Sequence, residues 1–567
     1  MSTNSNETTP LLGNHVERTN DSSYTGLETG GHDGGSFDER HERDVPIEQN
    51  ELLPVGMGVF LAAMDGTIVT SSYAAIGNDL KQLQSSSWLA TGYLMTLTSV
   101  HRAFLEQLGF NRPQAVIRKT KRYLWISLLV KSRKSCLLFA HVIFGLGCLG
   151  CGLARSMPEL IAARIFTGIG GGGLTTVVSI LVSDFVPLRQ RGTWQGVLNI
   201  IFSAGSSSGA PLGGIFADKL SWRWSFLFQV PITIMGFFAI VFALKTKQDN
   251  GVSQNTKTET LGEKLRRIDF LGAIALVSAV FSLLFGLDTG SNISWTVPLC
   301  YISLISSLVL TIAFGFIEAT PSLAKEPLAP KRITSNISLI GSYLTNLSII
   351  GVGFGSVFQF ALYVQAVKGK SASNVGVYLI PPILAGVSGS LMSGIVMQKT
   401  GKYRLLTITS MFFLIIACLS IDTIIYFNPE WGLAALLSCI SITTTLVALI
   451  ANVPPEDQAI ATAVSYLFRS LGGVIGISVG SAVAQQTLRA FLERRLEGEN
   501  YDIEKIIREV RESLTYIDTY DPVLRDIVKS SYGQASLSAF GMITGLAVLG
   551  FIASMLIKEK SLDTTPK

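Results

Sequence analysis

Long apolar stretches recur along almost the whole chain, and they decide what it can fold into. A helix needs about 20 apolar residues to cross the hydrocarbon core of a bilayer, and about fourteen stretches approach that length. They cover 52–76, 86–100, 135–154, 160–183, 193–216, 224–244, 269–287, 296–317, 337–366, 373–397, 403–426, 431–451, 459–486 and 538–557, of which 86–100 is the weakest. With 48% hydrophobic and 15% charged residues, the sequence predicts an all-α polytopic membrane protein.

Positive charge is concentrated in four connections, at 118–134, 189–191, 264–267 and 399–404. Each joins an even-numbered apolar stretch to the odd-numbered one that follows. Because lysine and arginine are enriched in cytoplasmic loops, we expect these connections and both termini to lie in the cytosol. The net charge of +5 is small for 567 residues. The expected environment is the lipid bilayer, and we expect no nucleic-acid partner.

Residues 1–50 are polar and rich in serine, threonine, asparagine, glycine and acidic residues. Such a segment buries too little apolar surface to fold alone, so we expect a disordered cytosolic tail. Within it, Glu7, Leu11 and Leu12 form E-x-x-x-L-L, the acidic dileucine pattern that adaptor complexes recognise. The pattern indicates a vacuolar or lysosomal sorting signal. A short pattern of this kind also arises by chance, and the alternative is a plain linker.

Asp65 lies in the middle of the first apolar stretch. A carboxylate at membrane depth costs several kcal/mol unless it faces a wet cavity or a partner, so its default meaning is a proton or cation site. A structural role is the alternative, in which Asp65 caps a helix break or pairs with a lysine or arginine. Arg164, near the middle of 160–183, is costly for the same reason.

Several motifs resemble the major facilitator superfamily, in particular its branch of fourteen-span drug:proton antiporters. Residues 65–69 read D-G-T-I-V, which is similar to the D-x-T-I-V signature of that branch. Arg164, followed by Gly168, Gly170 and Gly172, resembles the motif whose arginine is associated with proton coupling. The strings MDGTIVTSSYAAIGNDL, VPPEDQAIATA and FRSLGGVIG look most like fungal vacuolar transporters of basic amino acids.

The stretch 205–214 resembles the antiporter motif of the same branch. Its conformational residues are Gly205, Gly209, Pro211, Gly213 and Gly214, with the proline one residue later than usual. Glycine every four residues makes a smooth stripe along which another helix can approach closely. Proline weakens the helix locally, so the stripe suits a rocking interface.

The resemblance implies a major facilitator fold of about fourteen helices, in two six-helix halves plus two extra helices, with the substrate between the halves. We divide the chain accordingly into a first half (51–244), a cytosolic loop (245–268), two linker spans (269–318), a second half (319–487), a non-cytosolic amphipathic loop (488–537), a last span (538–557) and a cytosolic tail (558–567). Charges that alternate with leucine, isoleucine and valine in 488–537 predict an amphipathic helix there.

Residues 101–134 depart from the family pattern. The superfamily carries G-x-x-x-D-x-x-G-R-[RK] between its second and third spans, and here only the stretch from Arg133 to Leu138 resembles the tail of that signature. The segment upstream lacks the glycine and the aspartate and interrupts the second span after Val100. Either the cytosolic latch has been lost, or the segment is a gene-model artefact such as a retained intron, which we favour because local and global patterns clash.

The function that the resemblance implies is proton-coupled antiport of small cationic solutes, namely lysine, arginine or histidine, from the cytosol into an acidic vacuole. Asp65 is the expected proton-coupling residue, together with Arg164. Candidates for lining the cavity are Tyr93, Asn199, Gln359, Tyr363 and Gln365. The rival interpretations are drug or toxin efflux at the plasma membrane, and a non-transporting nutrient sensor or inactive product.

Enzymatic chemistry is not predicted. The glycine run 168–173 is not followed by Gly-Lys-Ser/Thr, as a phosphate-binding loop requires, and it lies inside an apolar stretch. The sequence offers no metal cluster and no nucleophile with a base outside the spans. We therefore expect no cofactor and no metal.

Overall fold

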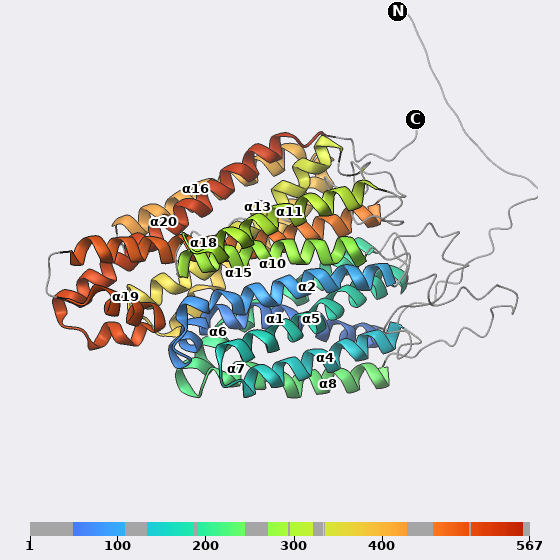
Figure 1. Ribbon diagram of the computed structural model, residues 1–567. Coiled ribbons are helices and arrows are strands. Elements are labelled where there is room, and N and C mark those ends of the chain that lie inside the picture. Colours follow the sequence, from blue (N-terminus) through green and yellow to red (C-terminus); the bar gives the residue numbers. More distant parts are fainter. Residues whose placement is uncertain are drawn as a thin grey trace, which may run out of the picture. The chain divides into compact units, whose positions relative to one another are not determined.

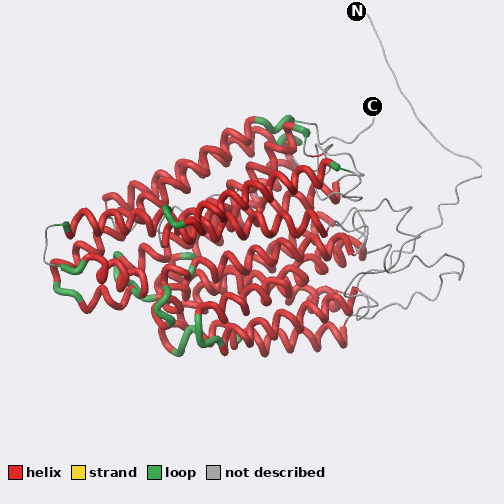
Figure 2. The backbone as a smooth tube through the Cα atoms, in the orientation of Figure 1, coloured by secondary structure: helices red, strands yellow, loops and turns green. Residues whose placement is uncertain are grey.

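The computed structural model describes residues 49–107, 133–185, 191–243, 270–292, 295–320, 333, 335–427, 458–497 and 501–559. These residues lie in one compact unit, Ile47–Lys567, and are almost entirely helical (Figures 1 and 2). The amino-terminal helices are α1 (Gln49–Asp79), α2 (Ser87–Gln107), α4 (Arg133–Leu153), α5 (Met157–Phe185), α6 (Arg191–Lys219), α7 (Arg223–Leu227) and α8 (Gln229–Ala243), with the 3-10 turn η1 (Leu83–Ser85).

Two helices, α10 (Phe270–Asn292) and α11 (Pro298–Ala319), follow and pack on each other. The carboxy-terminal helices are α13 (Ile337–Ala366), α14 (Ala372–Tyr378), α15 (Ile380–Thr400), α16 (Arg404–Phe427), α18 (Gln458–Leu496), α19 (Ile503–Glu512) and α20 (Pro522–Met555), with the 3-10 turn η5 (Leu514–Thr519). The long helices run side by side in one bundle (Figure 1).

Eleven helices of the described part are long and apolar enough to cross a membrane. The fourteen expected stretches exceed this number for three identifiable reasons. The stretch 86–100 falls on α2, which has 21 residues but includes His101, Arg102 and Glu106, so it is long enough and yet not apolar enough to count among the eleven. The stretch 373–397 is divided between α14 and α15, and 431–451 lies outside the described residues. The polytopic all-helical class is confirmed, while the number fourteen is not.

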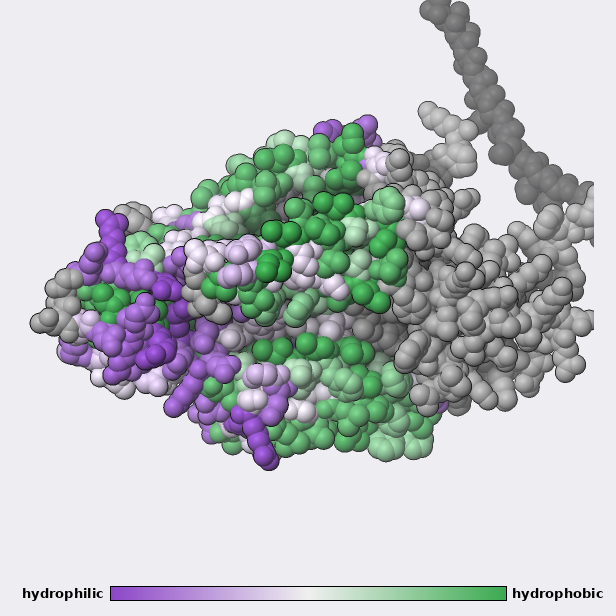
Figure 3. Space-filling model, viewed as in Figure 1, coloured by the Kyte–Doolittle hydropathy of each residue, from purple (hydrophilic) through white to green (hydrophobic). Residues whose placement is uncertain are grey.

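The surface of the bundle shows why it belongs in a bilayer. Apolar residues cover the middle of the helices, and hydrophilic residues gather at the end that carries α19 (Figure 3). On α11 the exposed apolar side chains recur at helical spacing on one side: Ile302, Ile305, Leu308, Val309, Ile312 and Phe316. Lipid tails are the medium that such a face requires.

Helices α18 and α20 are longer than a membrane is thick, with 39 and 34 residues. At 1.5 Å per residue, α18 extends about 58 Å against a hydrocarbon core of about 30 Å. Their ends therefore project at the α19 end, where α19 and η5 join them. We call the described residues between Leu488 and Tyr532 the cap. The amphipathic helix predicted in 488–537 corresponds to α19, which buries Ile506, Ile507 and Val510.

The glycine stripe of α6 lies against α1. A Cβ atom added at Gly205, Gly209 or Gly213 would overlap backbone carbonyl oxygens of α1. The close approach lets the Thr67 hydroxyl donate to the Ser206 carbonyl at 2.9 Å and the Ser71 hydroxyl to the Ala210 carbonyl at 2.6 Å. Helix α6 is continuous through Pro211.

We predict that Gly209→Ala destabilises the protein, because the new methyl group must push α1 and α6 apart. Overpacking of this kind costs about 1–3 kcal/mol. Thermal unfolding in detergent measures the effect. The matched control is Gly353→Ala, also on a long helix, where an added Cβ meets nothing within 4 Å. Equal melting temperatures for the two variants would contradict the tight α1–α6 contact.

Candidate functional site

Asp65 and Arg164 form an ion pair inside the amino-terminal helices. The Nη1 atom of Arg164, on α5, donates to both carboxylate oxygens of Asp65, on α1, at 2.8 and 2.7 Å. Both side chains are buried, with 0% and 1% of their surfaces exposed. The structure therefore pairs Asp65 with an arginine, which is the arrangement given above as the structural alternative for Asp65, and the partner is Arg164, the other charged residue that the sequence singled out.

Neighbouring helices complete the surroundings of the pair. Gln229, the first residue of α8, donates from Nε2 to Asp65 Oδ1 at 3.2 Å and to the Ser225 carbonyl at 3.0 Å. Arg164 Nε donates to the Leu89 carbonyl of α2 at 3.2 Å. The Arg164 guanidinium also lies over the Tyr93 ring, 4.4 Å from its centroid. Five helices, counting α7 through Phe226, therefore meet at one charge pair.

The energetics of the site follow from its burial. Removing one partner of a buried ion pair leaves an uncompensated charge and costs about 3–5 kcal/mol, whereas the intact pair contributes little net stability. The intact pair therefore adds little to the free energy of folding, whereas loss of either partner would change what holds α1 to α5.

The predicted cavity residues separate into different places. Tyr93 lies in the site, and its hydroxyl donates to the Ala62 carbonyl at 3.2 Å. Gln359 and Tyr363 are buried on α13, while Gln365 donates to the Ala361 carbonyl at 3.3 Å. Within the described part of the chain, both amide atoms of Gln359 lack a hydrogen-bond partner. Asn199 lies on α6. That these residues line a substrate cavity stays a prediction.

The glycines predicted as motif residues lie at helix contacts, and the predicted sorting residues lie outside the described part of the chain. The glycine run 168–173 lies inside α5, where Gly168 and Gly172 pack on α2, so it forms no phosphate-binding loop. Gly214 of α6 lies against the Ala372 backbone of α14. Glu7, Leu11 and Leu12 lie outside the described residues, as does most of the anomalous segment 101–134. Among the described residues, no group of three histidine, cysteine or acidic side chains could hold a metal.

The amino-terminal and carboxy-terminal helices are joined at the α19 end. Asp218, near the end of α6, accepts hydrogen bonds from the Ala372 and Ser373 amides at 3.2 and 2.8 Å. Asn78, near the end of α1, accepts from the Ser513 hydroxyl at 3.1 Å and the Leu514 amide at 2.8 Å. The bundle is thus closed at this end by contacts that any opening there must break.

A third contact reinforces the same closure. The Tyr73 ring of α1 stacks on Phe358 of α13 with ring centroids 4.0 Å apart. The Tyr73 hydroxyl donates to the Phe358 carbonyl at 3.2 Å. The contacts of Asn78 and Asp218 lie at the ends of α1 and α6, whereas the Tyr73–Phe358 contact is buried farther inside α1 and α13.

Sequence reasoning missed three polar groups inside the bundle. Gln229 is the first residue of the apolar helix α8, and a polar residue in an apolar stretch is the same kind of sequence signal as Asp65. His141 of α4 is buried; its Nδ1 bonds the Leu137 carbonyl at 2.9 Å, and its Nε2 has no partner in the described part of the chain. Asp422 of α16 accepts from the Thr544 hydroxyl at 3.0 Å. Each could have been found by searching every apolar stretch for an isolated polar or charged residue, as was done for Asp65 in the first stretch.

Comparisons with known proteins agree with one another. The family model for the Major Facilitator Superfamily matches residues 123–477. The vacuolar membrane amino acid uptake transporter fnx2 of Schizosaccharomyces pombe is 35% identical over 524 residues, covering 91% of this chain and 85% of that protein. Vacuolar basic amino acid transporter 2 of Saccharomyces cerevisiae is 30% identical over 488 residues, covering 83% and 97%.

Two further similarities widen the picture. The multidrug resistance protein fnx1 of Schizosaccharomyces pombe is 33% identical over 539 residues, covering 93% of this chain and 96% of that protein. Among solved structures, a bacterial homologue of the human lysosomal transporter Spinster matches with a TM-score of 0.53 and 16% identity, covering 90% of this chain and 98% of that one. At this identity the likeness shows the fold alone.

We predict that Asp65→Asn lowers stability by about 3–5 kcal/mol, because Arg164 is left charged and buried. The double variant Asp65→Asn with Arg164→Leu should recover part of that loss. Melting temperatures of the four proteins of this cycle give the coupling. As a control, Asp79→Asn removes a partner from the exposed Asp79–Arg223 pair and should cost less than about 1 kcal/mol. Additive effects at Asp65 and Arg164 would refute the coupling.

Proposed function

This chain belongs to the Major Facilitator Superfamily, and on that premise we propose that it is a proton-coupled antiporter that imports lysine, arginine or histidine into the vacuole. The observation that carries the proposal is the buried Asp65–Arg164 pair at membrane depth. An ionisable pair in this position marks an ion or substrate pathway. Two relatives named as vacuolar amino acid transporters support the substrate class and the compartment.

The pair supplies a way to couple protons to helix packing. Asp65 can be neutralised either by Arg164 or by a proton, and the two exclude each other. In the described state Arg164 holds the carboxylate, with Gln229 as a second donor. Protonation from the acidic side would release the Arg164 guanidinium, whose other contacts are the Leu89 carbonyl and the Tyr93 ring. The contacts between α1 and α5 would then differ between the state with the Asp65–Arg164 pair and the state with protonated Asp65, as alternating access requires.

The closed α19 end fits the same cycle. The positive-inside rule supports a lumenal position for this end, because the described basic residues Lys134, Arg191, Lys399 and Arg404 lie at helix ends on the opposite side. Import needs this end to open once per cycle. The contacts of Asn78 and Asp218 are hydrogen bonds with partly exposed backbone groups, which are weak enough to break and re-form. We assign no enzymatic step and no cofactor to the protein.

Drug efflux is the second candidate function, favoured by the similarity to the multidrug resistance protein fnx1. It uses the same fold and coupling but would favour an aromatic, apolar cavity. The polar pair with Gln229 argues for cationic solutes instead. A non-transporting sensor is the third candidate, and the anomalous segment 101–134 is its support. Measured uptake of labelled lysine or arginine by isolated vacuoles decides among the three.

We predict that Asp65→Asn abolishes ATP-dependent uptake of labelled arginine into vacuoles, because the variant keeps the shape of the side chain but does not titrate. Uptake is measured with and without an uncoupler, and immunoblots of vacuolar membranes report abundance. The control is Asp526→Asn, an exposed carboxylate near the start of α20, which should transport normally. Wild-type uptake by Asp65→Asn would return Asp65 to a structural role.

A separate prediction concerns location. Replacing Leu11 and Leu12 together by alanine should move a fluorescently tagged protein from the vacuolar membrane towards the cell surface, because the adaptor complex reads this pair. The control replaces Thr8 and Thr9, which the pattern leaves free. If the fluorescence stays on the vacuole, the sorting interpretation is wrong, and plasma-membrane fluorescence of the unaltered protein would favour efflux.

A further inference from the structure

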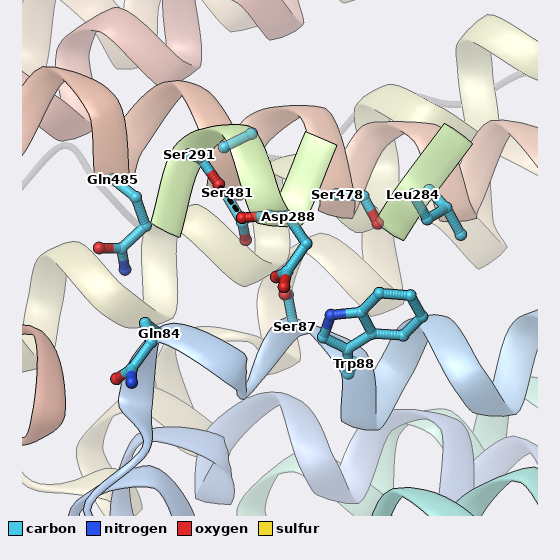
Figure 4. Close-up of a pocket in the computed structure, with 10 residues that line it drawn as sticks. Gln84, Ser87, Trp88, Leu284, Asp288, Ser291, Ser478, Ser481 and Gln485 are labelled. Atoms are coloured by element: carbon cyan, nitrogen blue, oxygen red, sulfur yellow. Dashed lines mark hydrogen bonds between the residues drawn. The ribbon is translucent and has the colours of Figure 1, made fainter. Parts of the chain in front are cut away.

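A small polar pocket lies at the α19 end, where three parts of the bundle meet (Figure 4). Gln84, Ser87 and Trp88 come from η1 and α2, Asp288 and Ser291 from α10, and Gln485 from α18. The cavity measures about 10 Å³, which is room for one water molecule. Its walls therefore include both sets of transmembrane helices and the extra helix α10 between them.

The pocket wall combines one carboxylate with amide, hydroxyl, aromatic and apolar side chains. The Asp288 carboxylate points towards Ser87 and Trp88 (Figure 4). Gln84 Oε1 is buried and has no hydrogen-bond partner in the part of the chain that the structure describes. The Trp88 indole forms a wall, and indole faces attract cations. A carboxylate, an orphaned amide oxygen and an aromatic ring together suit a cationic head group that donates hydrogen bonds.

A guanidinium of the chain itself already reaches this place. Arg511, on α19 of the cap, donates from Nε to Gln485 Oε1 at 3.1 Å and from Nη2 to the Ser291 carbonyl at 3.3 Å. The Asp288 carboxylate attracts it, while burial, with the Arg489 charge adding to it, lowers the pKa of Arg511. The side chain is 8% exposed. Holding a cation here is costly, and the acceptors of the pocket wall offset that cost.

We propose that this pocket is a second site for cationic head groups, on the non-cytosolic side, and that Arg511 is a tethered occupant which competes with basic amino acids for it. The proposal rests on the proposed function, because it takes the same substrate class. With Arg511 in place the cavity has room for one water molecule. Withdrawal of the Arg511 guanidinium from Gln485 and Ser291, which belong to the pocket wall, would leave those acceptors and the adjoining space for another guanidinium. The cap thereby limits return of lumenal arginine or lysine to the transport path.

Counterflow tests the proposal. Isolated vacuoles are preloaded with unlabelled arginine, the proton gradient is collapsed with an uncoupler, and entry of labelled arginine is measured. Arg511→Gln should raise the initial rate by about threefold or more, the size expected for loss of a partly solvated ionic competitor. Preloading with citrulline, which has the same length but no charge, should not stimulate entry. The matched control is Arg508→Gln, on the exposed face of the same helix, which should behave as wild type.

Three results would overturn the proposal: equal counterflow in Arg511→Gln and wild type, equal stimulation by citrulline, or a matching gain in Arg508→Gln. If Arg511→Gln does not accumulate in the membrane, Asp288→Asn decides instead. It should raise the lumenal arginine concentration for half-maximal counterflow by about threefold, and an unchanged value overturns the site. The readouts separate the two proposals. If arginine counterflow is observed but uptake is insensitive to the uncoupler, proton coupling is wrong and the proposed cation site remains supported.

Discussion

The structure depends on a pair of opposite charges buried where the surroundings are hydrocarbon. A single buried charge, of Asp65 or of Arg164, would cost several kcal/mol there, and the fold avoids that cost by bringing α1 and α5 within hydrogen-bonding distance. The other helices arrange themselves around that requirement. The glycines of α6 and of α5 carry no side chain between backbones, which allows α1, α2, α5 and α6 to approach closely enough to shield the charges from lipid.

Closure at the α19 end is built from a different kind of contact. There, helix ends meet through amide and carboxylate oxygens and one stacked aromatic pair, with partly solvated partners. Each bond is worth about 0.5–1.5 kcal/mol net, because water can replace it. Tight packing within the amino-terminal helices and weak hydrogen bonds between the two sets of helices are the combination that lets each set move as a unit. The buried residues of the cap, such as Ile506, Val510 and Leu524, belong to the same hydrophobic core as those of the bundle.

The sequence was sufficient for the helical class and for singling out Asp65 and Arg164, because both rest on local signals, namely apolar length and isolated charge, but it did not predict that the two residues pair with each other. It was insufficient where three-dimensional neighbours decide. Nothing in the order of residues says that Arg511 of the cap meets Gln485 and Ser291, which lie far away along the chain. Helix ends were also uncertain, since α18 and α20 continue into water on alternating charged and apolar residues that hydropathy reads as a loop. The sequence also could not show whether Gln359 and Tyr363 line a cavity, because the polarity of a residue does not indicate which neighbouring helix its side chain contacts.

Three carboxylates within apolar helices have different neighbouring groups, and we compare their proposed roles on that basis. Asp65 has a full counter-charge, Asp422 accepts from the Thr544 hydroxyl, and Asp288 lines a pocket near the charge of Arg511. Asp65 is held by a guanidinium inside the amino-terminal helices, so any change in this pair alters the packing of α1 on α5. Asp288 lies where α2, α10 and α18 meet, so a cation bound there would contact both sets of helices. The two roles that we propose, proton coupling and cation binding, are therefore assigned to carboxylates in two separate places, one inside a set of helices and one between the sets.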